Sequence, residues 1–502
     1  MTTEFVRKQP EETGISSQAI LDYINALEQA DTEMHGLMIM RHDAVITEGW
    51  WKPYGPKIRH GLQSHTKTYT ATAVGIALRE GKLRLDERII DIFPEEAPEH
   101  PSENLQKLTI RDVLCMGTGM VDDTPNTEHW LKDFLAHDVV YEPGKAFFYN
   151  NAGSTLLAAI VEKRTGERLL DYLKPRLFDL IGIDYDNLRC LNMADGTSLG
   201  AGGMFATTED NLRLMKLYKD GGVWDGVRIL DEDFVHDAVT KQNDNATEAL
   251  HNPTAYDNFV GYGYQLWMCR PEGVYRADGA MGQYTIVIPS EDMIISINET
   301  AMGPTNQQRT LDITWDFLKA IHEDTPEDPE AYEHLKDKLE SLALPDVHVE
   351  PGSPLRNVID GRGIHIETGK ITLQKGFIGL PVGSGITDLR FDCGVLDVMM
   401  TYTEDGIENS VVIGTDGERA VNHLNEPEDT MQLLAAHGYF EGEDTFTVHF
   451  RWVEACFEYV WRFVFKDEDV TITETWNSML PEDPDAVPVT GKLEELEIDT
   501  VL

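Results

Sequence analysis

A change in sequence pattern near residue 322 constrains the fold more than any other feature of the chain. Residues 322–345 read HEDTPEDPEAYEHLKDKLESLALP, an acidic stretch with two proline breaks and a short helical pattern. Helical and strand patterns are mixed before it, whereas β-rich segments follow it. At 502 residues the chain also exceeds the usual size of one domain. We therefore expect a first domain at 1–325, an acidic linker or helix at 326–345 and a second domain at 346–502.

The first domain has strand patterns near both ends and helical patterns between them. Residues 34–51 resemble two strands joined by a polar turn, and residues 284–297 resemble a hairpin. Helices are expected at 64–80 and 154–165, each followed directly by a glycine. This order predicts an α/β (α+β) domain whose terminal strands share one antiparallel sheet flanked by helices.

The second domain is rich in short apolar and β-branched runs separated by Gly, Asp and Glu turns. The expected strands are Ile364–Ile366, Leu389–Phe391, Val395–Tyr402, Thr445–Trp452, Tyr459–Phe465 and Val470–Thr475. They predict a small antiparallel sheet or barrel. Its expected role is to pack beside the first domain.

Charge and apolar content exclude several classes of partner. The formal net charge is -46, which repels nucleic-acid phosphates and anionic lipid surfaces. No run approaches the roughly 18 apolar residues that a membrane span needs. We therefore expect neither a nucleic acid nor a membrane as partner, while the sequence leaves the oligomeric state open.

Cysteine use and the N-terminal residues point to a reducing compartment. Residues 1–14 contain no apolar core of the kind found in signal peptides. The five cysteines are widely spread and form no Cys-x-x-Cys pair. They are expected to be buried thiols in a cytoplasmic protein without a metal site or cofactor.

Ser64 and Lys67 form the only Ser-x-x-Lys tetrapeptide in the chain. On a helix, residues three apart lie on the same face, so the lysine amine can reach the serine hydroxyl. A serine is a poor nucleophile until a base takes its proton, and a lysine is such a base only when its pKa falls well below about 10.4. Because the whole chain is acidic, local desolvation must supply that shift.

Two further elements carry groups suited to the same chemistry. Tyr149 and Asn151 follow a turn and precede a predicted helix, where a phenol can relay protons and an amide can hold a lysine and a carbonyl. Gly279 lies just before the strand 284–289, where a backbone N–H could pair with that of Ser64 as an oxyanion hole. Each element is a weak signal by itself.

In this order the three elements resemble the serine β-lactamase and penicillin-binding-protein superfamily, whose signature contains Ser-x-x-Lys. The resemblance covers residues 10–322 and is closest to the branch with class C β-lactamases, esterases, D-aminopeptidases and nylon-oligomer hydrolases. It extends through SHTKTYTATAVGIALREGKLRLDERIIDIFP, YEPGKAFFYNNAGSTLLAAIVEKRTGERL, GAGGMFATTEDNLRLMKLYKDGG and GQYTIVIPSEDMIISI. It implies a β-lactamase-like catalytic domain, with the barrel-like extension that many members carry.

The resemblance also implies a role for each site residue. Ser64 would form the acyl-enzyme, Lys67 would be the base and Tyr149 would shuttle the proton. Asn151 would position Lys67 and the substrate amide. The backbone of Ala280, after the third-motif glycine Gly279, would complete the oxyanion hole.

The third motif departs from the family pattern. Relatives often have a Lys or His two residues before the glycine, whereas this chain has Ala277 and then Asp278. The family cation binds a substrate carboxylate, which Asp278 would repel, although Arg276 lies close enough in sequence to substitute. We therefore expect a small-molecule ester or neutral amide as substrate.

Other interpretations stay open. A β-lactamase or D-amino-acid peptidase would use the same residues, and a non-catalytic sensor would acylate without turnover. His65 is expected to line the pocket rather than to serve as a second base. Trp267 and Tyr264 are expected either to line an acyl pocket or to lie in the core.

Overall fold

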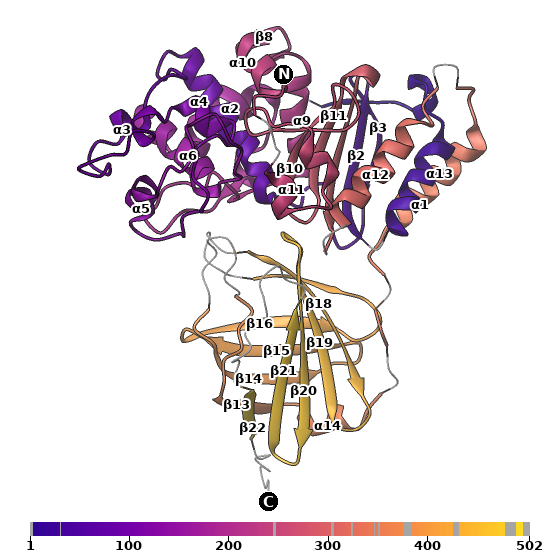
Figure 1. Cartoon of the computed structure of the whole chain (residues 1–502). Helices are drawn as coiled ribbons and strands as arrows, with labels where there is room; N and C mark the ends of the chain where they lie inside the picture. Colours follow the sequence, from indigo (N-terminus) through magenta and orange to yellow (C-terminus); the bar gives the residue numbers. More distant parts are fainter. Residues whose placement is uncertain are drawn as a thin grey trace, which may run out of the picture. The chain divides into compact units, whose positions relative to one another are not determined.

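The computed structural model describes residues 4–30, 32–243, 247–302, 306–322, 325–345, 347–349, 352–374, 383–424, 431–476 and 488–494. The chain divides into two compact units, Met1–Ala343 and Leu344–Leu502 (Figure 1). The segment expected as a linker contains helix α13 (Pro329–Ser341), which belongs to the first unit and packs against α1 (Ser17–Glu28).

A seven-stranded sheet organises the first unit. Its strands, in spatial order, are β1 (Val6–Arg7), β3 (Ala44–Trp50), β2 (Glu33–Arg41), β12 (Met293–Thr300), β11 (Gln283–Ile288), β10 (Tyr275–Gly279) and β9 (Trp267–Met268). All neighbours are antiparallel except β1 and β3. Ile39 of β2 pairs with Ile295 of β12, so strands from the two ends of the unit share one sheet, as the sequence predicts.

Helices cover both faces of this sheet. Helices α1, α12 (Asn306–Leu318) and α13 lie on one side, and α9 (Thr208–Lys219) packs on β2, β11 and β12 from the other (Figure 1). Beyond α9 lies a helical region around α2 (Thr66–Arg79) and α6 (Asn151–Thr165), which pack on each other. Residues 66–77 of α2 are buried without a break, because this helix is enclosed on all sides rather than amphipathic.

The remaining elements of the first unit are short. They are α3 (Ile89–Ile92), α4 (Ile110–Leu114), α5 (Trp130–Ala136), α7 (Leu169–Leu173), α8 (Asp179–Ile181), α10 (Glu232–Ala238), α11 (Glu248–His251), β4 (His60–Gly61), β5 (Arg189–Cys190), β6 (Met204–Ala206), β7 (Val223–Trp224) and β8 (Val227–Arg228).

The second unit is a closed nine-stranded barrel. Its strands are β13 (Arg362–Thr368), β14 (Ile386–Cys393), β15 (Asp397–Glu404), β16 (Ile407–Gly414), β18 (Leu433–Glu441), β19 (Thr445–Trp452), β20 (Phe457–Lys466), β21 (Asp469–Trp476) and β22 (Val489–Leu493), with β17 (Ala420–His423) beside β18 and α14 (Leu355–Ile359) before the first strand. Pairing of Gly414 with His437 joins β16 to β18 and closes the ring, which confirms the barrel-like prediction. Within the described ranges of both units, no helix is both long and apolar enough to cross a membrane.

Candidate active site

Ser64 lies in a single 3-10 turn, Gln63–His65, that leads straight into α2. The preceding residue, Gln63, has a φ of 51°, a left-handed conformation that is uncommon for a residue with a side chain. This sharp turn presents the Ser64 hydroxyl at the N-terminal end of the helix, and Lys67 follows one helical turn later.

Lys67 is the most constrained polar side chain of the site. It is 1% exposed, and its Nζ donates to Ser64 Oγ at 2.9 Å, to Asn151 Oδ1 at 2.9 Å and to the carbonyl of Ala201 at 2.7 Å. Burial lowers the pKa of Lys67 to about 7, although the carboxylates of Asp123 and Asp278 act in the opposite direction. The amine can therefore be neutral at physiological pH, as proton abstraction from Ser64 requires.

Tyr149 holds its phenol against the nucleophile. Its ring stacks on Trp267, with centroids 5.7 Å apart and planes 13° apart, and the Lys67 Nζ lies 4.8 Å from its centroid. Burial raises the pKa of Tyr149, while a hydrogen bond with the Ser64 side chain acts the other way. The phenol consequently keeps its proton at neutral pH and is placed to pass a proton along the Ser64 oxygen.

Asn151 opens helix α6 and is oriented by Asp123, a residue that the sequence patterns did not single out. Asp123 accepts from Asn151 Nδ2 at 2.9 Å, from the Asn151 backbone N–H at 3.0 Å and from the Ala152 N–H at 2.9 Å. The carboxylate therefore binds the first N–H groups of the helix. It also turns the side-chain oxygen Oδ1 of Asn151 toward Lys67.

Gly279 and Ala280 bring the end of β10 against the Ser64 turn. A Cβ at Gly279 would lie 2.1 Å from the carbonyl oxygen of Leu62 and 3.2 Å from the amide nitrogen of His65, so only glycine fits. Ala280 lines the same cavity as Ser64. The structure thus brings Ser64, Lys67, Tyr149, Asn151, Gly279 and Ala280 together at one site.

A cavity of about 380 Å³ opens beside Ser64. Among the described residues its walls are formed by Ser64, Val121, Asp123, Phe148, Tyr149, Thr247, Glu248, His251, Asn258, Trp267, Asp278, Ala280 and Gln307. These walls combine aromatic surface with three carboxylates. A volume of this size suits a small molecule.

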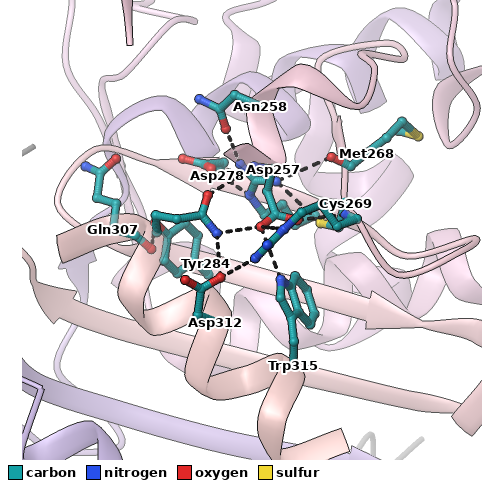
Figure 2. A network of polar contacts seen from close by, with 12 residues as sticks. Asp257, Asn258, Met268, Cys269, Asp278, Tyr284, Gln307, Asp312 and Trp315 are labelled. Carbon is teal, nitrogen blue, oxygen red and sulfur yellow. Dashed lines mark hydrogen bonds and ion pairs between the residues drawn. The ribbon is translucent and has the colours of Figure 1, made fainter. Parts of the chain in front are cut away.

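Arg276 does not face this cavity as a free cation. It is 1% exposed, and its guanidinium donates to Asp278 at 2.7 Å and to Asn258 Oδ1 at 2.5 Å. Figure 2 shows Asp278 and Asn258 within the surrounding polar network. Burial raises the pKa of Asp278, and Arg276 opposes that shift. Arg276 is therefore engaged by Asp278 and Asn258, and it does not substitute for the family cation that binds a substrate carboxylate.

Three other residues are placed by the fold. Trp267 lines the cavity. Tyr264 is not among the lining residues, and its hydroxyl donates a hydrogen bond to Asp237 at 3.0 Å. His65 was expected to line the pocket, and that prediction is wrong. Its ring is fully buried, with Nε2 3.0 Å from Thr285 Oγ1, because β11 covers the side of the turn from which the ring projects.

Comparison with known proteins agrees with this geometry. The sequence profile of the beta-lactamase family matches residues 24–316, which is more than half of the chain. The chain belongs to the beta-lactamase family. Membership confirms the superfamily expected from the motifs and, with it, a hydrolase of the β-lactamase-related class.

Relatives of this beta-lactamase-family protein include a hydrolase and a penicillin-binding protein. It is 24% identical to the 6-aminohexanoate-dimer hydrolase of Paenarthrobacter ureafaciens, over 57% of this chain and 78% of that protein. It is 26% identical to penicillin-binding protein 4 of Amycolatopsis lactamdurans, over 47% of this chain and 70% of that protein. Among solved structures it resembles the octameric penicillin-binding protein homologue of Pyrococcus abyssi, with a TM-score of 0.48, 15% identity and coverage of 95% and 99% of the two chains.

Proposed function

We propose that the protein hydrolyses small-molecule esters or neutral amides through an acyl-enzyme on Ser64. The observation that carries this proposal is the 2.9 Å contact between the buried Lys67 amine and the Ser64 hydroxyl, together with a lysine pKa of about 7. A lysine of this kind is neutral often enough to act as a base at physiological pH.

The reaction follows from the geometry in two halves. Lys67 takes the proton of Ser64 as the Ser64 oxygen forms a bond to the substrate carbonyl carbon. The N–H groups of Ser64 and Ala280 bind the resulting oxyanion. Tyr149 delivers a proton to the leaving alcohol or amine as that bond breaks, and the proton on Lys67 passes to the Tyr149 oxygen. A water molecule then attacks the acyl-enzyme and gives a proton to the same base system, which returns it to the Ser64 oxygen as the acyl bond breaks and the acid leaves.

The third motif supports esters and neutral amides over carboxylate-bearing substrates. Asp278 lies in the cavity wall. Arg276, the cation nearest to it in sequence, donates a hydrogen bond to Asp278. A β-lactamase or D-amino-acid peptidase activity is the second candidate, since one relative is a penicillin-binding protein. Both candidates use the same nucleophile and differ in the charge of the substrate.

We place the reaction in the cytoplasm. Cys115, Cys190, Cys269, Cys393 and Cys456 are all free thiols, as in proteins of a reducing compartment. The net charge of -46 supports a protein that acts on small molecules rather than on nucleic acids or anionic membranes.

Intact mass spectrometry tests the mechanism. Wild type, Ser64→Ala and Lys67→Ala would be treated with a fluorophosphonate probe and, separately, with p-nitrophenyl acetate and butyrate. Ser290→Ala, which removes an exposed hydroxyl on a distant turn, is the matched control. We expect one adduct and ester turnover in wild type and in the control, and neither in the other two variants. Equal reactivity of wild type and Ser64→Ala would refute the proposal.

A further inference from the structure

Glu248 is a buried carboxylate in the cavity wall that has few compensating contacts. It begins α11, is 8% exposed and lines the cavity beside Ser64. Its hydrogen bond within the described residues is a long one, 3.4 Å, from Asn258 Nδ2. Among those residues no Lys or Arg lies within ion-pair distance of it. Burial raises the pKa of Glu248, whereas His251, an exposed residue of the same helix that also lines the cavity, and the more distant Arg276 favour its charged form. A nearly enclosed carboxylate with so little compensation is costly in the empty protein.

The other acidic groups of the cavity already have partners. Asp123 binds the N–H groups at the start of α6, and Asp278 is held by Arg276. No Lys or Arg is among the described residues that line the cavity.

The position of Glu248 is fixed by the same network that removes Arg276 from the cavity. Arg276 donates to Asn258 Oδ1, which leaves the amide Nδ2 of Asn258 to face Glu248. Arg276 thus orients Asn258, and Asn258 holds one oxygen of Glu248. Among the described residues, no hydrogen bond to the other oxygen, Oε2, is found.

The aromatic walls suit a cation as well. Phe148, Tyr149 and Trp267 line the same cavity as Glu248. Tyr149 already stacks on Trp267 and has the Lys67 amine over its ring, and Phe148 stacks on Tyr141. Ring surface that is not covered in this way attracts ammonium groups, most strongly where water is excluded, so it supplements the carboxylate of Glu248.

We propose that the substrate carries a cationic amino group, which Glu248 binds while Ser64 attacks the ester or amide carbonyl. This inference rests on the proposed hydrolase function and specifies its substrate class. A substrate with a carboxylate in the same place would be repelled by Glu248 and Asp278.

Matched substrates that differ by one charge test the inference, with one pair for each side of the scissile bond. The leaving-group pair is acetylthiocholine and neohexyl thioacetate, in which carbon replaces the quaternary nitrogen. The acyl pair is the p-nitrophenyl esters of γ-trimethylammoniobutyrate and γ-tert-butylbutyrate. The quantity measured is the ratio of kcat/KM for the cationic substrate to that for its neutral isostere, in wild type, Glu248→Gln and Glu272→Gln.

Glu248→Gln keeps the side-chain shape and the bond from Asn258, whereas Glu272→Gln removes one exposed charge outside the cavity lining. We expect the ratio to fall about tenfold or more in Glu248→Gln for at least one pair, since a buried charge-assisted contact is lost. It should stay at the wild-type value in Glu272→Gln. Urea unfolding midpoints check that both variants fold, and Glu272→Gln should turn over the neutral esters at the wild-type rate.

A measurement on wild type alone covers the case in which Glu248→Gln is inactive. Choline should inhibit neutral-ester turnover more strongly than neohexyl alcohol, its uncharged isostere. Equal ratios in all three proteins for both pairs, or equal inhibition by choline and the alcohol, would overturn the inference while leaving the hydrolase function intact. If no ester is turned over in a Ser64-dependent way, the proposed function itself fails, and this inference falls with it.

Discussion

Asp123 and Asn151 form a two-point contact at the start of α6, in which one carboxylate oxygen accepts the side-chain N–H at 2.9 Å and the backbone N–H at 3.0 Å. This contact fixes which way the Asn151 amide points. The carbonyl oxygen then faces Lys67 Nζ at 2.9 Å. Asp123 therefore acts on the base through Asn151, as a positioning residue rather than a catalytic one.

Replacing Asp123 by Asn should slow acylation and shift its pH dependence. The variant loses a charge that raises the pKa of Lys67. The pH at which kcat/KM begins to rise should therefore be lower than in wild type. Loss of a charged hydrogen-bond acceptor should lower kcat about tenfold with little change in KM. Steady-state kinetics across pH measures both effects. The control is Asp122→Asn, the exposed neighbour, and an equal response in that variant would rule out the positioning role.

The activity of wild type should rise with pH around the pKa of Lys67. Only the neutral amine of Lys67 accepts the Ser64 proton. Burial lowers the pKa of this amine to about 7, although the carboxylates of Asp123 and Asp278 raise it. The kcat/KM for a neutral ester should therefore rise with pH through a midpoint of about 7. Lys67→Met, which keeps the chain length, should reduce acylation by about 10²- to 10⁴-fold and lack this limb. A limb that persists unchanged in Lys67→Met would assign the titration to another group.

The same pKa shift affects stability. Burial lowers the pKa of Lys67 in the folded protein from its ordinary value of 10.5 to about 7, so between these pH values the unfolded chain binds more protons than the folded one. The free energy of unfolding should therefore rise with pH across this window. Urea unfolding at several pH values measures the slope, which Lys67→Met should reduce. An identical slope in both proteins would contradict a depressed lysine pKa.

A methyl group at Gly279 should damage both the fold and the site. It would meet the Leu62 carbonyl at 2.1 Å, so β10 or the Ser64 turn must move. We expect Gly279→Ala to lower the free energy of unfolding by about 1 to 3 kcal/mol and to reduce ester turnover. Gly55→Ala is the control, since its new Cβ would have an ordinary contact of 3.8 Å. Equal unfolding midpoints for the two variants would show that the close approach is absent.

Arg276 and Asp278 should be strongly coupled in stability. Arg276→Met leaves Asp278, whose side chain is only 15% exposed, without its partner, and breaking a buried pair typically costs about 3 to 5 kcal/mol. The double variant Arg276→Met with Asp278→Asn should be less destabilised than the sum of the single variants. A double-mutant cycle by urea unfolding measures that coupling energy. Additive single effects would mean that the two charges do not stabilise each other.

Local spacing in the sequence predicted much of the catalytic centre. The three-residue separation of Ser64 and Lys67 on a helix brings amine and hydroxyl together whatever the rest of the fold does. The strand patterns at 34–51 and 284–297 predicted the two hairpins, and their pairing at Ile39 and Ile295 is as expected. In the barrel, β16, β17, β18 and β22 lay outside the predicted segments, because apolar and polar residues alternate less regularly in these strands.

The sequence by itself identified the family and the candidate nucleophile and base, since these depend on residues that are close along the chain. Tertiary structure alone decided the Asp123–Asn151 contact, the burial that lowers the pKa of Lys67, and the cavity around Glu248. Asp123 and Glu248 are two of 88 acidic residues, and no local pattern separates them from the rest. Only chain folding brings distant loops to one place and removes water from it, and that removal gives these charges their effect.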